Sequence, residues 1–427
     1  MGPVSGDLPR VGVVVPYYRA QEGLDRLLAG LEQQTYPAGL LDVVVADDGS
    51  PQPPVLGERP FAVRTVRQED LGFRAAAARN LGARATDAPV VLFLDGDMVP
   101  SPGYAAAMAA ALHPPGEHPR LVVGRRRHAT LSGHPPEQVA RWLHDPVVVP
   151  SVRELAEPSW LTQGYAETDD LRAPDSRSYR FVISACLGVD RALLTRTGGF
   201  DDTFVGYGGE DWDLGYRAWL AGADLQHLPE AVAWHDGPDI VGRDEAAVAR
   251  KDAESLRVAA VITEPGSRDP HLLWPYADTV VRVDLPPGTT AGQVVLTVGE
   301  VLRGTDARCW LVGAAAAALS EGGGAGPLPD PRVATGEPPA AHRARARHLV
   351  DVTAPVLLDR DTTLSALCAL GPARYAAGLT VRHTRDLARG QDQVPPAERD
   401  AQALVTRQRP ATLEAAWGWG GHRPSGP

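Results

Sequence analysis

Cysteine is scarce in this sequence, and so is lysine. Cys186, Cys309 and Cys368 are odd in number, far apart and without the spacing of metal ligands, which argues against a disulfide framework and a zinc site. This cysteine usage fits a reducing compartment best. Lys251 is the only lysine, a bias that we attribute to the base composition of the gene and not to function.

Long apolar runs and an excess of positive charge are also missing. No stretch approaches the roughly 18 apolar residues that span a membrane, and the opening MGPVSGDLPRVGVVVPYY has no basic segment leading into an apolar one. With 42 Lys and Arg against 53 Asp and Glu, the net charge is −11, which argues against broad nucleic-acid binding. We therefore expect a cytoplasmic protein with no transmembrane segment and no nucleic-acid partner.

What the sequence does hold is a regular alternation of strand and helix patterns. With 427 residues, 44% of them hydrophobic, it is long enough for two or three globular domains. Strands are predicted in RVGVVVPYY, LDVVVADDGS, APVVLFLDGDMVPSP, RFVISACLGVD and AVAWHDG, and helices in EGLDRLLAGLEQQTYP and FRAAAARNLGARAT. Residues 125–180 are predicted to be loops around a short helix near Trp142. The alternation predicts an α/β fold, with a mostly parallel, doubly wound sheet and a ligand crevice at the carboxyl ends of its strands.

Acidic residues follow two of these strands. Asp95 and Asp97 in LDGDMVP can place one carboxylate on a divalent cation and the other on a ribose or a water, since Mn²⁺ and Mg²⁺ prefer oxygen ligands. Solvated aspartates that cap a strand end give the same pattern. Asp47 and Asp48 in VADDGS can likewise form a simple Asx turn or accept a hydrogen bond from a nucleotide.

Three basic side chains also have two interpretations each. Arg74 and Arg79 belong to the helix that follows; either could reach a diphosphate with its planar donor fork, or could be surface solvation. His235 follows Trp234 at the end of an apolar strand, where a histidine is either structural or a ligand.

The stretch FVGYGGEDWDL, residues 204–214, combines glycines, an aromatic and paired acids. Gly208 and Gly209 permit a close backbone approach to a ligand. Glu210 and Asp211 can bind a metal, accept hydroxyl protons, or sit at a helix amino terminus because of the helix dipole.

The order of these pieces resembles the family 2 glycosyltransferases of the GT-A fold. VVVPYYR, ADDGS, an Arg-containing helix, LDGD, GGFDDTFVGYGGEDWDL and AWHDG follow one another as in that family, over about residues 9–240. The later part looks most like the galactosyltransferase-type carboxyl region shared by chondroitin-type polymerases. The resemblance implies a GT-A catalytic domain in residues 1–264.

The resemblance also implies roles for particular residues. It implies Pro16, Tyr18 and Asp48 around the nucleotide base, Arg74 near the base or diphosphate, Asp95 at the ribose, Asp97 and His235 on the metal, and Tyr207, Gly208, Gly209 and Glu210 at the acceptor sugar. Cys186 departs from the family, because many relatives have a polar residue there, and this puts sugar-hydroxyl recognition at that position in doubt.

The chemistry expected from the resemblance is glycosyl transfer with inversion. An acceptor hydroxyl would attack the anomeric carbon, Asp211 would take its proton as general base, and Mn²⁺ or Mg²⁺ would neutralise the leaving diphosphate. The expected donor is a nucleotide sugar, with a uridine diphosphate sugar as the first choice, and the expected acceptor is a glycan or a small molecule. A nucleotidyltransferase and a non-catalytic glycan- or nucleotide-binding module are the alternatives.

Residues 265–427 lie outside the family motifs and are predicted to form an accessory α/β domain with a flexible C-terminal tail. DTVVRVDLPPG, TAGQVVLTVGEVLRG and ARCWLVG repeat the strand, helix, strand order. Aligning Leu349 with Leu81 sets PVLLDRD against PVVLFLDGD, which suggests a degenerate second copy of the nucleotide-binding sheet. In that alignment AAWGWGGHRPSGP reaches two glycines without Glu and Asp, so the copy would not catalyse. An unrelated small α/β domain is the alternative.

Overall fold

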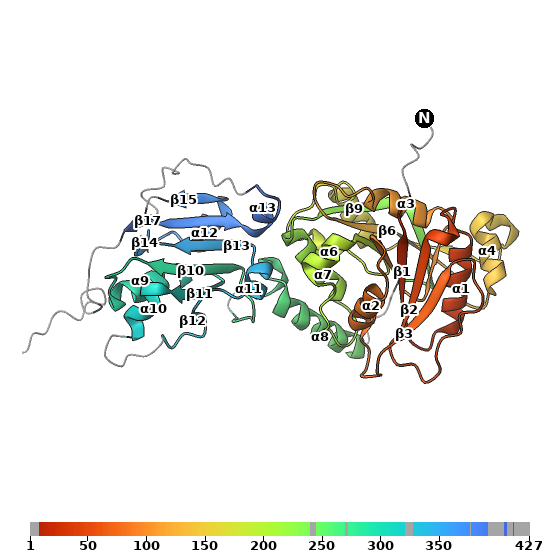
Figure 1. Cartoon of the computed structure of the whole chain (residues 1–427), viewed down its shortest axis with the longest axis horizontal. Coiled ribbons are helices and arrows are strands. Elements are labelled where there is room, and N and C mark those ends of the chain that lie inside the picture. Colours follow the sequence, from red (N-terminus) through yellow and green to blue (C-terminus); the bar gives the residue numbers. More distant parts are fainter. Residues whose placement is uncertain are drawn as a thin grey trace, which may run out of the picture. The chain divides into compact units, whose positions relative to one another are not determined.

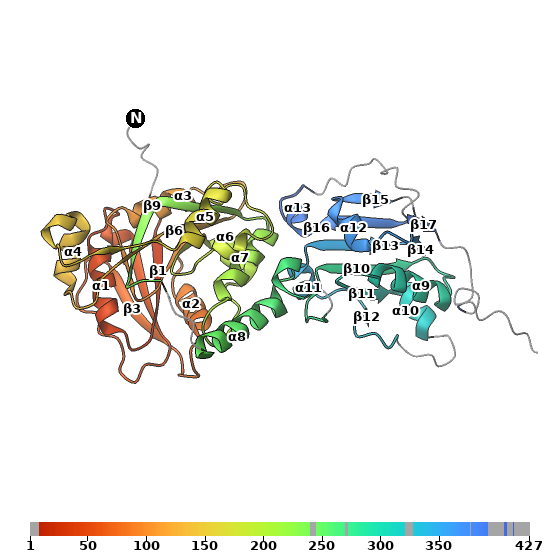
Figure 2. The same ribbon diagram turned by 180° about the vertical axis from the view of Figure 1, so that it is seen from behind.

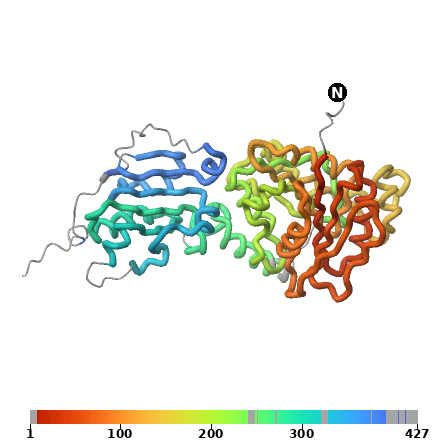
Figure 3. The backbone as a smooth tube through the Cα atoms, viewed as in Figure 1, coloured from red at the N-terminus to blue at the C-terminus, as the bar shows by residue number. Residues whose placement is uncertain are grey.

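The computed structural model describes residues 8–239, 245–269, 272–320, 328–375, 377–391, 405–407 and 413. Its contacts divide the chain into two compact units, Met1–Val258 and Ala259–Pro427, whose backbones are traced in Figure 3. This boundary lies a few residues before residue 264, where the sequence predicts it. The predicted tail motif AAWGWGGHRPSGP lies outside the described residues.

Unit 1 alternates strands and helices in its first half and becomes less regular after β6. Its strands are β1 (Val11–Tyr17), β2 (Leu41–Asp47), β3 (Ala62–Arg67), β4 (Val90–Leu94), β5 (Met98–Pro100), β6 (Arg120–Ala129), β7 (Glu154–Leu155), β8 (Cys186–Asp190) and β9 (Asp224–Asp236). Its helices are α1 (Gln21–Glu32), α2 (Ala75–Arg84), α3 (Tyr104–Leu112), α4 (Pro136–His144), α5 (Ser159–Glu167), α6 (Arg191–Thr197), α7 (Glu210–Leu220) and α8 (Glu245–Val261).

The sheet of unit 1 has the strand order β3-β2-β1-β4-β8-β6-β9-β5. Strands β3, β2, β1 and β4 are parallel, and β8 runs antiparallel to both its neighbours. Because the β1-to-β2 and β3-to-β4 crossovers run in opposite directions, right-handed connections place α1 and α2 on opposite faces (Figure 1). The predicted doubly wound α/β fold is confirmed.

Burial explains why these segments became strands. The β-branched runs of β1, β2 and β4 are almost wholly buried, as expected for parallel strands covered on both faces. Helix α3 packs on β6 and β9, as the view from behind shows (Figure 2).

The register of the strands decides which polar residues meet. Tyr17 of β1 lies opposite Asp47 of β2, and Val14 lies opposite Phe93 of β4. The residues that follow β1, β2 and β4 therefore share one edge of the sheet. Strand β9 pairs antiparallel with β5 so that His235 lies opposite Met98, which brings His235 beside Asp97.

The prediction of loops from residue 125 is wrong at its start. Residues 120–129 form β6, a central strand that pairs with β8 and β9. Ion pairs link Arg125 to Glu157 at 2.6 Å and Arg127 to Glu154 at 2.5 Å. In this part of β6, ion-paired arginines stand where a strand pattern would have apolar residues. The apolar periodicity that predicts a strand is therefore absent from the sequence. The predicted helix near Trp142 is α4.

Unit 2 is a smaller α/β unit with its own core. Its strands are β10 (Thr279–Leu285), β11 (Ala307–Val312), β12 (Val333–Thr335), β13 (His348–Val352), β14 (Val356–Leu358), β15 (Ala373–Tyr375), β16 (Leu379–His383) and β17 (Val405–Arg407). Its helices are α9 (Ala291–Leu302), α10 (Gly313–Ser320), α11 (Ala340–Arg345), α12 (Leu364–Ala369) and α13 (Thr384–Ala388).

The sheet of unit 2 repeats the topology of unit 1. Its order is β12-β11-β10-β13-β16-β15. The first four strands are parallel, and β16 runs antiparallel to β13 and β15. The segment β3-β2-β1-β4-β8-β6 of unit 1 has the same chain order and directions. A duplication requires this correspondence.

The predicted residue alignment of the repeat is nevertheless wrong. The strand in the place of β4 is β13, whereas PVLLDRD contributes β14, which pairs with β17. Helix α11 ends at Arg345, so Arg347 and His348 do not match the helical Arg79 and Asn80. Alanine- and arginine-rich segments align readily in several registers, which explains the error.

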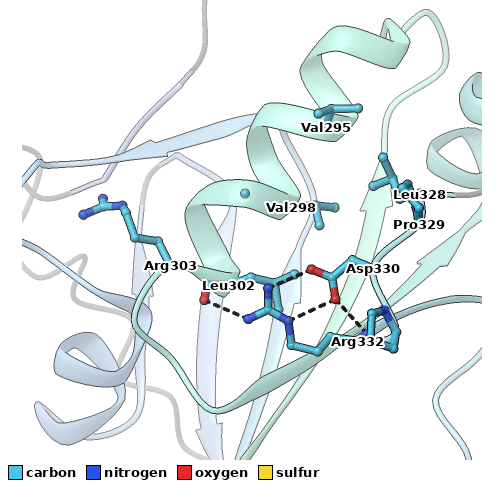
Figure 4. A pocket seen from close by; sticks show the side chains of 10 residues that line it. Val295, Val298, Leu302, Arg303, Leu328, Pro329, Asp330 and Arg332 are labelled. Carbon is cyan, nitrogen blue, oxygen red and sulfur yellow. Dashed lines mark hydrogen bonds and ion pairs between the residues drawn. The ribbon is translucent and has the colours of Figure 1, made fainter. Parts of the chain in front are cut away.

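Unit 2 also contains a cavity of about 490 Å³ beside α9 (Figure 4). Its wall is largely aliphatic, with Val295, Val298 and Leu302 on α9. The carboxylate of Asp330 is paired with Arg332 at 2.7 Å. The cavity therefore offers apolar surface and a neutralised ion pair, not a group prepared for catalysis.

No helix among the residues that the structure describes combines the length and the apolar character needed to cross a bilayer.

Candidate active site

A cavity of about 340 Å³ opens at the carboxyl edge of the unit 1 sheet. The predicted site residues that line it are Pro16, Tyr18, Asp48, Asp95, Asp97, Tyr207 and His235. Those that do not line it are Arg74, Gly208, Gly209, Glu210 and Asp211. The strand register thus brings residues from distant parts of the sequence to one cavity of a size that small ligands use.

The predicted base-binding side of the cavity is already hydrogen-bonded within the protein. Asp48 accepts hydrogen bonds from the backbone N–H of Arg74 at 2.8 Å and from Gln68 Nε2 at 2.6 Å. The Arg74 guanidinium donates to the carbonyl of Glu69. In this arrangement Arg74 holds the loop after β3 against Asp48, and its predicted contact with a nucleotide stays a prediction.

Pro16 and Tyr18 form the part of the wall that follows β1. Tyr18 is 40% exposed, and its hydroxyl donates to Asp70 at 3.0 Å. The guanidinium of Arg19 lies 4.7 Å from the centre of the Tyr18 ring. An aromatic face is therefore available at the mouth of the cavity, where a base could stack.

Arg79 joins the two halves of the site. It is 3% exposed and donates to Asp95 at 2.7 Å and to Glu210 at 2.9 Å. Burial by itself lowers the pKa of Arg79, but the charges of Asp95 and Glu210 outweigh it and raise the pKa. The guanidinium therefore stays charged and fixes the end of β4 against the start of α7. The sequence placed Arg79 and Arg74 on one helix but did not distinguish their roles.

Glu210 and Asp211 are the first residues of α7, so the helix-dipole interpretation is structurally correct. The helix dipole does not explain two further features of these carboxylates. Oε1 of Glu210 is paired with Arg79, while its buried Oε2 has no hydrogen-bond partner among the described residues. Burial, and then the charge of Glu210, raise the pKa of the partly exposed Asp211 to about 7, against the opposing charge of Arg79.

Asp97 and His235 form the predicted metal pair. His235 Nε2 lies 3.3 Å from Asp97 Oδ2, and its Nδ1 lies 3.3 Å from the Gly237 carbonyl. If Nδ1 carries the proton toward that carbonyl, the Nε2 lone pair faces the carboxylate. Burial by itself lowers the pKa of His235, but Asp97 outweighs it and raises the pKa. A proton or a cation between His235 Nε2 and the Asp97 carboxylate would stabilise these two acceptors.

The donor set fits a divalent cation with an incomplete protein shell. Within the described residues, no cluster of three or more His, Cys, Asp or Glu side chains could hold a metal. One carboxylate and one imidazole can bind Mn²⁺ or Mg²⁺ if the ligand supplies further oxygens, as phosphate groups do. Asp97 and His235 are therefore suited to a cation that binds together with a diphosphate.

Two residues near this pair were not predicted from the sequence. Arg126 on β6 lines the cavity, and its Nη2 lies 3.3 Å from Asp239. His128, also on β6, is fully buried, and its ring centre lies 4.8 Å from that of His235. The run GRRRH was the available signal, but it had been assigned to a loop.

Cys186 does not line the cavity. Its thiol is fully buried and donates to the Gly124 carbonyl at 3.2 Å. Burial raises the pKa of Cys186 to about 12. This cysteine therefore belongs to the sheet core, and its neighbour Ala185 is the residue that reaches the cavity wall.

Comparison with known proteins adds independent evidence. Residues 12–162 match the model described as glycosyl transferase family 2. Residues 174–235 match the model described as the N-terminal domain of galactosyltransferase. Residues 12–162 are thus similar to family 2 glycosyltransferases. The predicted recognition is thereby confirmed, and both matched regions carry residues of the cavity.

Curated relatives are glycosyltransferases as well. Validoxylamine A glucosyltransferase of Streptomyces hygroscopicus subsp. limoneus is 31% identical over 244 residues, which cover 50% of this chain and 48% of the relative. Chondroitin synthase of Pasteurella multocida (strain Pm70) is 29% identical over 247 residues, 53% of this chain and 25% of the relative. The chain thus spans about half or less of the length of these two relatives.

Among solved structures, the mannosyltransferase PcManGT from Pyrobaculum calidifontis in complex with GDP-Man and Mn²⁺ is 20% identical, with a TM-score of 0.38. The match covers 58% of this chain and 64% of that chain. Crystal structures of S. aureus TarS match with TM-scores of 0.38 and 0.37. Likenesses at this level carry no argument about the ligand of unit 1.

Replacing Arg79 by methionine should destabilise unit 1, because Asp95 and Glu210 would remain near each other without a cation. We expect a loss of about 3–5 kcal/mol in the free energy of unfolding, measured by urea denaturation. Arg84→Met, at an exposed position of the same helix, should change stability by less than about 0.5 kcal/mol. Equal losses in the two variants would contradict the bridging role of Arg79.

Proposed function

We propose that residues 1–264 catalyse the metal-dependent transfer of a sugar, with inversion, from a nucleotide diphosphate sugar to a hydroxyl of a glycan or another acceptor. The observation that carries this proposal is the Asp95–Arg79–Glu210 bridge, which joins the donor side of one cavity to the start of α7. The donor we propose is a uridine diphosphate sugar, with Pro16 and Asp48 at the base.

The donor half of the proposal rests on the cavity wall. In our assignment Asp95 accepts a hydrogen bond from the ribose while Arg79 holds its other side. Asp97 and His235 would hold Mn²⁺ or Mg²⁺, and the cation would supply charge neutralisation for the leaving diphosphate. Arg126, which lines the same cavity, adds a positive charge on the side where that anion develops.

The acceptor half rests on the start of α7. As the acceptor oxygen forms its bond to the anomeric carbon, the bond from that carbon to the diphosphate oxygen breaks, and the hydroxyl proton passes to Asp211. Two backbone N–H groups orient this carboxylate, from Trp212 at 2.8 Å and from Ser184 at 3.4 Å. In our assignment Tyr207 stacks on the acceptor sugar and Glu210 accepts from an acceptor hydroxyl through Oε2.

A direct test is to incubate the chain with Mn²⁺ and a panel of nucleotide sugars, and to measure nucleotide diphosphate release with and without glycan acceptors. We expect release to be stimulated by an acceptor for at least one uridine diphosphate sugar. A chain that binds nucleotides or glycans but releases no diphosphate in any combination would be a binding module. Pyrophosphate release from nucleoside triphosphates would instead indicate a nucleotidyltransferase.

Removal of either proposed metal ligand should abolish the response to Mn²⁺. We expect Asp97→Ala and His235→Ala each to lower Mn²⁺-stimulated diphosphate release by at least about tenfold, because the diphosphate charge is no longer neutralised. His144→Ala, at an exposed histidine of α4, is the matched control. Full Mn²⁺ stimulation in the His235 variant would remove His235 from the site.

The stereochemistry and the base are tested together. Asp211→Asn should lower transfer by at least about a hundredfold while leaving the dissociation constant for the nucleotide nearly unchanged, because the carboxylate acts on the acceptor. NMR of the wild-type product should give the anomer opposite to that of the donor. A product with the donor's anomeric configuration would overturn the inverting mechanism, even with sugar transfer intact.

The raised pKa of Asp211, about 7, predicts the pH profile. A general base works in its deprotonated form, so transfer should increase as pH rises through about 7 and level off above it. In Glu210→Gln the midpoint should move to lower pH, because the neighbouring negative charge that raises the Asp211 pKa is gone. Saturating Mn²⁺ keeps proton competition at the metal ligands out of the profile. A midpoint below about 5 in the wild type would contradict the assignment.

We also propose that residues 265–427 are a degenerate copy of the GT-A sheet that does not catalyse. The support is the shared strand order and direction of the two sheets. In the place of Asp95 and Asp97, which follow β4, unit 2 has Thr353, Ala354 and Pro355 after β13, and none of these side chains is a carboxylate. The accessory role of this unit, in packing or in holding an acceptor, is part of the same proposal.

A further inference from the structure

Helix α8, which leads out of unit 1, packs against the loop that begins α7. This loop, residues 204–212, is called the acceptor loop here, because it contains Tyr207, Glu210 and Asp211. The helix is the long one labelled α8 in Figure 2. Its contacting residues are Lys251, Glu254, Arg257 and Val258. Their spacing of three and four residues places most of them on one face of the helix.

The two adjacent glycines of the acceptor loop face this helix. Gly208 and Gly209 have φ angles of +85° and +93°, which residues with side chains rarely adopt. A Cβ atom on Gly208 would lie 2.7 Å from Glu254 Cδ, and one on Gly209 would lie 2.8 Å from Val258 Cγ2. From the sequence, we expected the glycines to allow close approach of a sugar. The structure gives a second reason for glycine at these positions, because α8 occupies the space that their side chains would fill.

Polar contacts complete the same interface. Arg257 Nη2 donates to the carbonyl of Tyr207 at 3.1 Å. Lys251 donates to the buried Glu254 at 2.7 Å, and its ammonium lies 5.3 Å from the centre of the Trp212 ring. The helix therefore contacts the loop before, at and after its glycine pair.

We propose that α8 positions the acceptor loop, with Arg257 and Glu254 as positioning residues for Tyr207 and Asp211. This inference rests on the proposed glycosyl transfer. A loop with two adjacent glycines has much backbone freedom, and Tyr207 is 61% exposed, so packing of its own ring does little to hold it. The contacts from α8 reduce that freedom, together with the hydrogen bond from the Gly206 N–H to the Phe73 carbonyl at 2.8 Å. Neither positioning residue touches the substrate in this proposal.

The proposal predicts that loss of the α8 contacts changes the acceptor kinetics and leaves the nucleotide affinity unchanged. Misplacing a positioned group by about 1 Å can cost a hundredfold in rate. Loss of the α8 contacts should therefore weaken steps that involve the acceptor. The nucleotide side of the cavity is held by Asp48, Asp95 and Arg79, and among the described residues none of these three forms a hydrogen bond or ion pair with α8. Nucleotide affinity should stay the same.

Arg257→Ala, Arg257→Lys and Leu256→Ala of the full chain form a matched set for this test. Leu256 is 63% exposed on the same helix and is the control for helix stability. We expect Arg257→Ala to lower kcat/KM for the acceptor by about tenfold or more, and Arg257→Lys to recover most of it, since a lysine can still donate to the Tyr207 carbonyl. Leu256→Ala should match the wild type.

The readouts are acceptor kcat and KM at saturating donor, the dissociation constant for the nucleotide diphosphate, and the thermal midpoint. A fall in acceptor kcat/KM with unchanged nucleotide affinity and recovery in Arg257→Lys supports the proposal. Equal effects on nucleotide affinity and acceptor kinetics, or wild-type kinetics in Arg257→Ala, would overturn it. A wild-type chain with no transferase activity would instead be a failure of the proposed function. Glu254→Gln, which keeps the shape of the side chain beside Gly208, is the second variant. Its kcat/KM for the acceptor should fall between the values of Arg257→Lys and Arg257→Ala.

Discussion

The buried guanidinium of Arg79 is the interaction on which the site depends. It holds Asp95, at the end of a central strand, and Glu210, at the start of α7, through charged hydrogen bonds of 2.7 and 2.9 Å. Without it, the two carboxylates would lie near each other with no cation between them. The charge of Glu210, after burial, raises the pKa of the adjacent Asp211. One arginine thus connects the proposed donor side to the proposed base.

The second constraint is the sheet itself. Parallel β1, β2 and β4 end at one edge, and the antiparallel pairing of β5 with β9 brings His235 to Asp97. At the end of the acceptor loop, Arg79 pairs with Glu210 and the backbone N–H of Ser184 donates to Asp211. In our proposal, α8 braces the preceding part of the loop through Arg257, Glu254 and Val258. The Arg79 bridge links the two sides at the start of α7, and the α8 contacts add a brace on the proposed acceptor side.

The fold and several polar residues of the cavity wall could be predicted from the sequence, because both depend on local patterns. Apolar runs predicted the central strands. The acidic residues that follow these runs, Asp48, Asp95 and Asp97, were predicted as site residues. Arg79 could not be distinguished from Arg74, because burial and partners come from tertiary packing. Strand β6 was missed because ion pairs cover its arginines in place of apolar contacts, and Arg126 was missed with it. The contacts of α8 were also beyond prediction, since no sequence pattern links Arg257 to a carbonyl fifty residues away.

The central claim is that one cavity holds a nucleotide diphosphate together with a divalent cation, beside the start of α7. A crystal structure of the chain with uridine diphosphate and Mn²⁺ tests it most directly. The account predicts Mn²⁺ bound by Asp97 and His235, with diphosphate oxygens completing its shell, and the uracil beside Pro16 and Asp48. A nucleotide bound elsewhere, or a cation that contacts neither Asp97 nor His235, would contradict it.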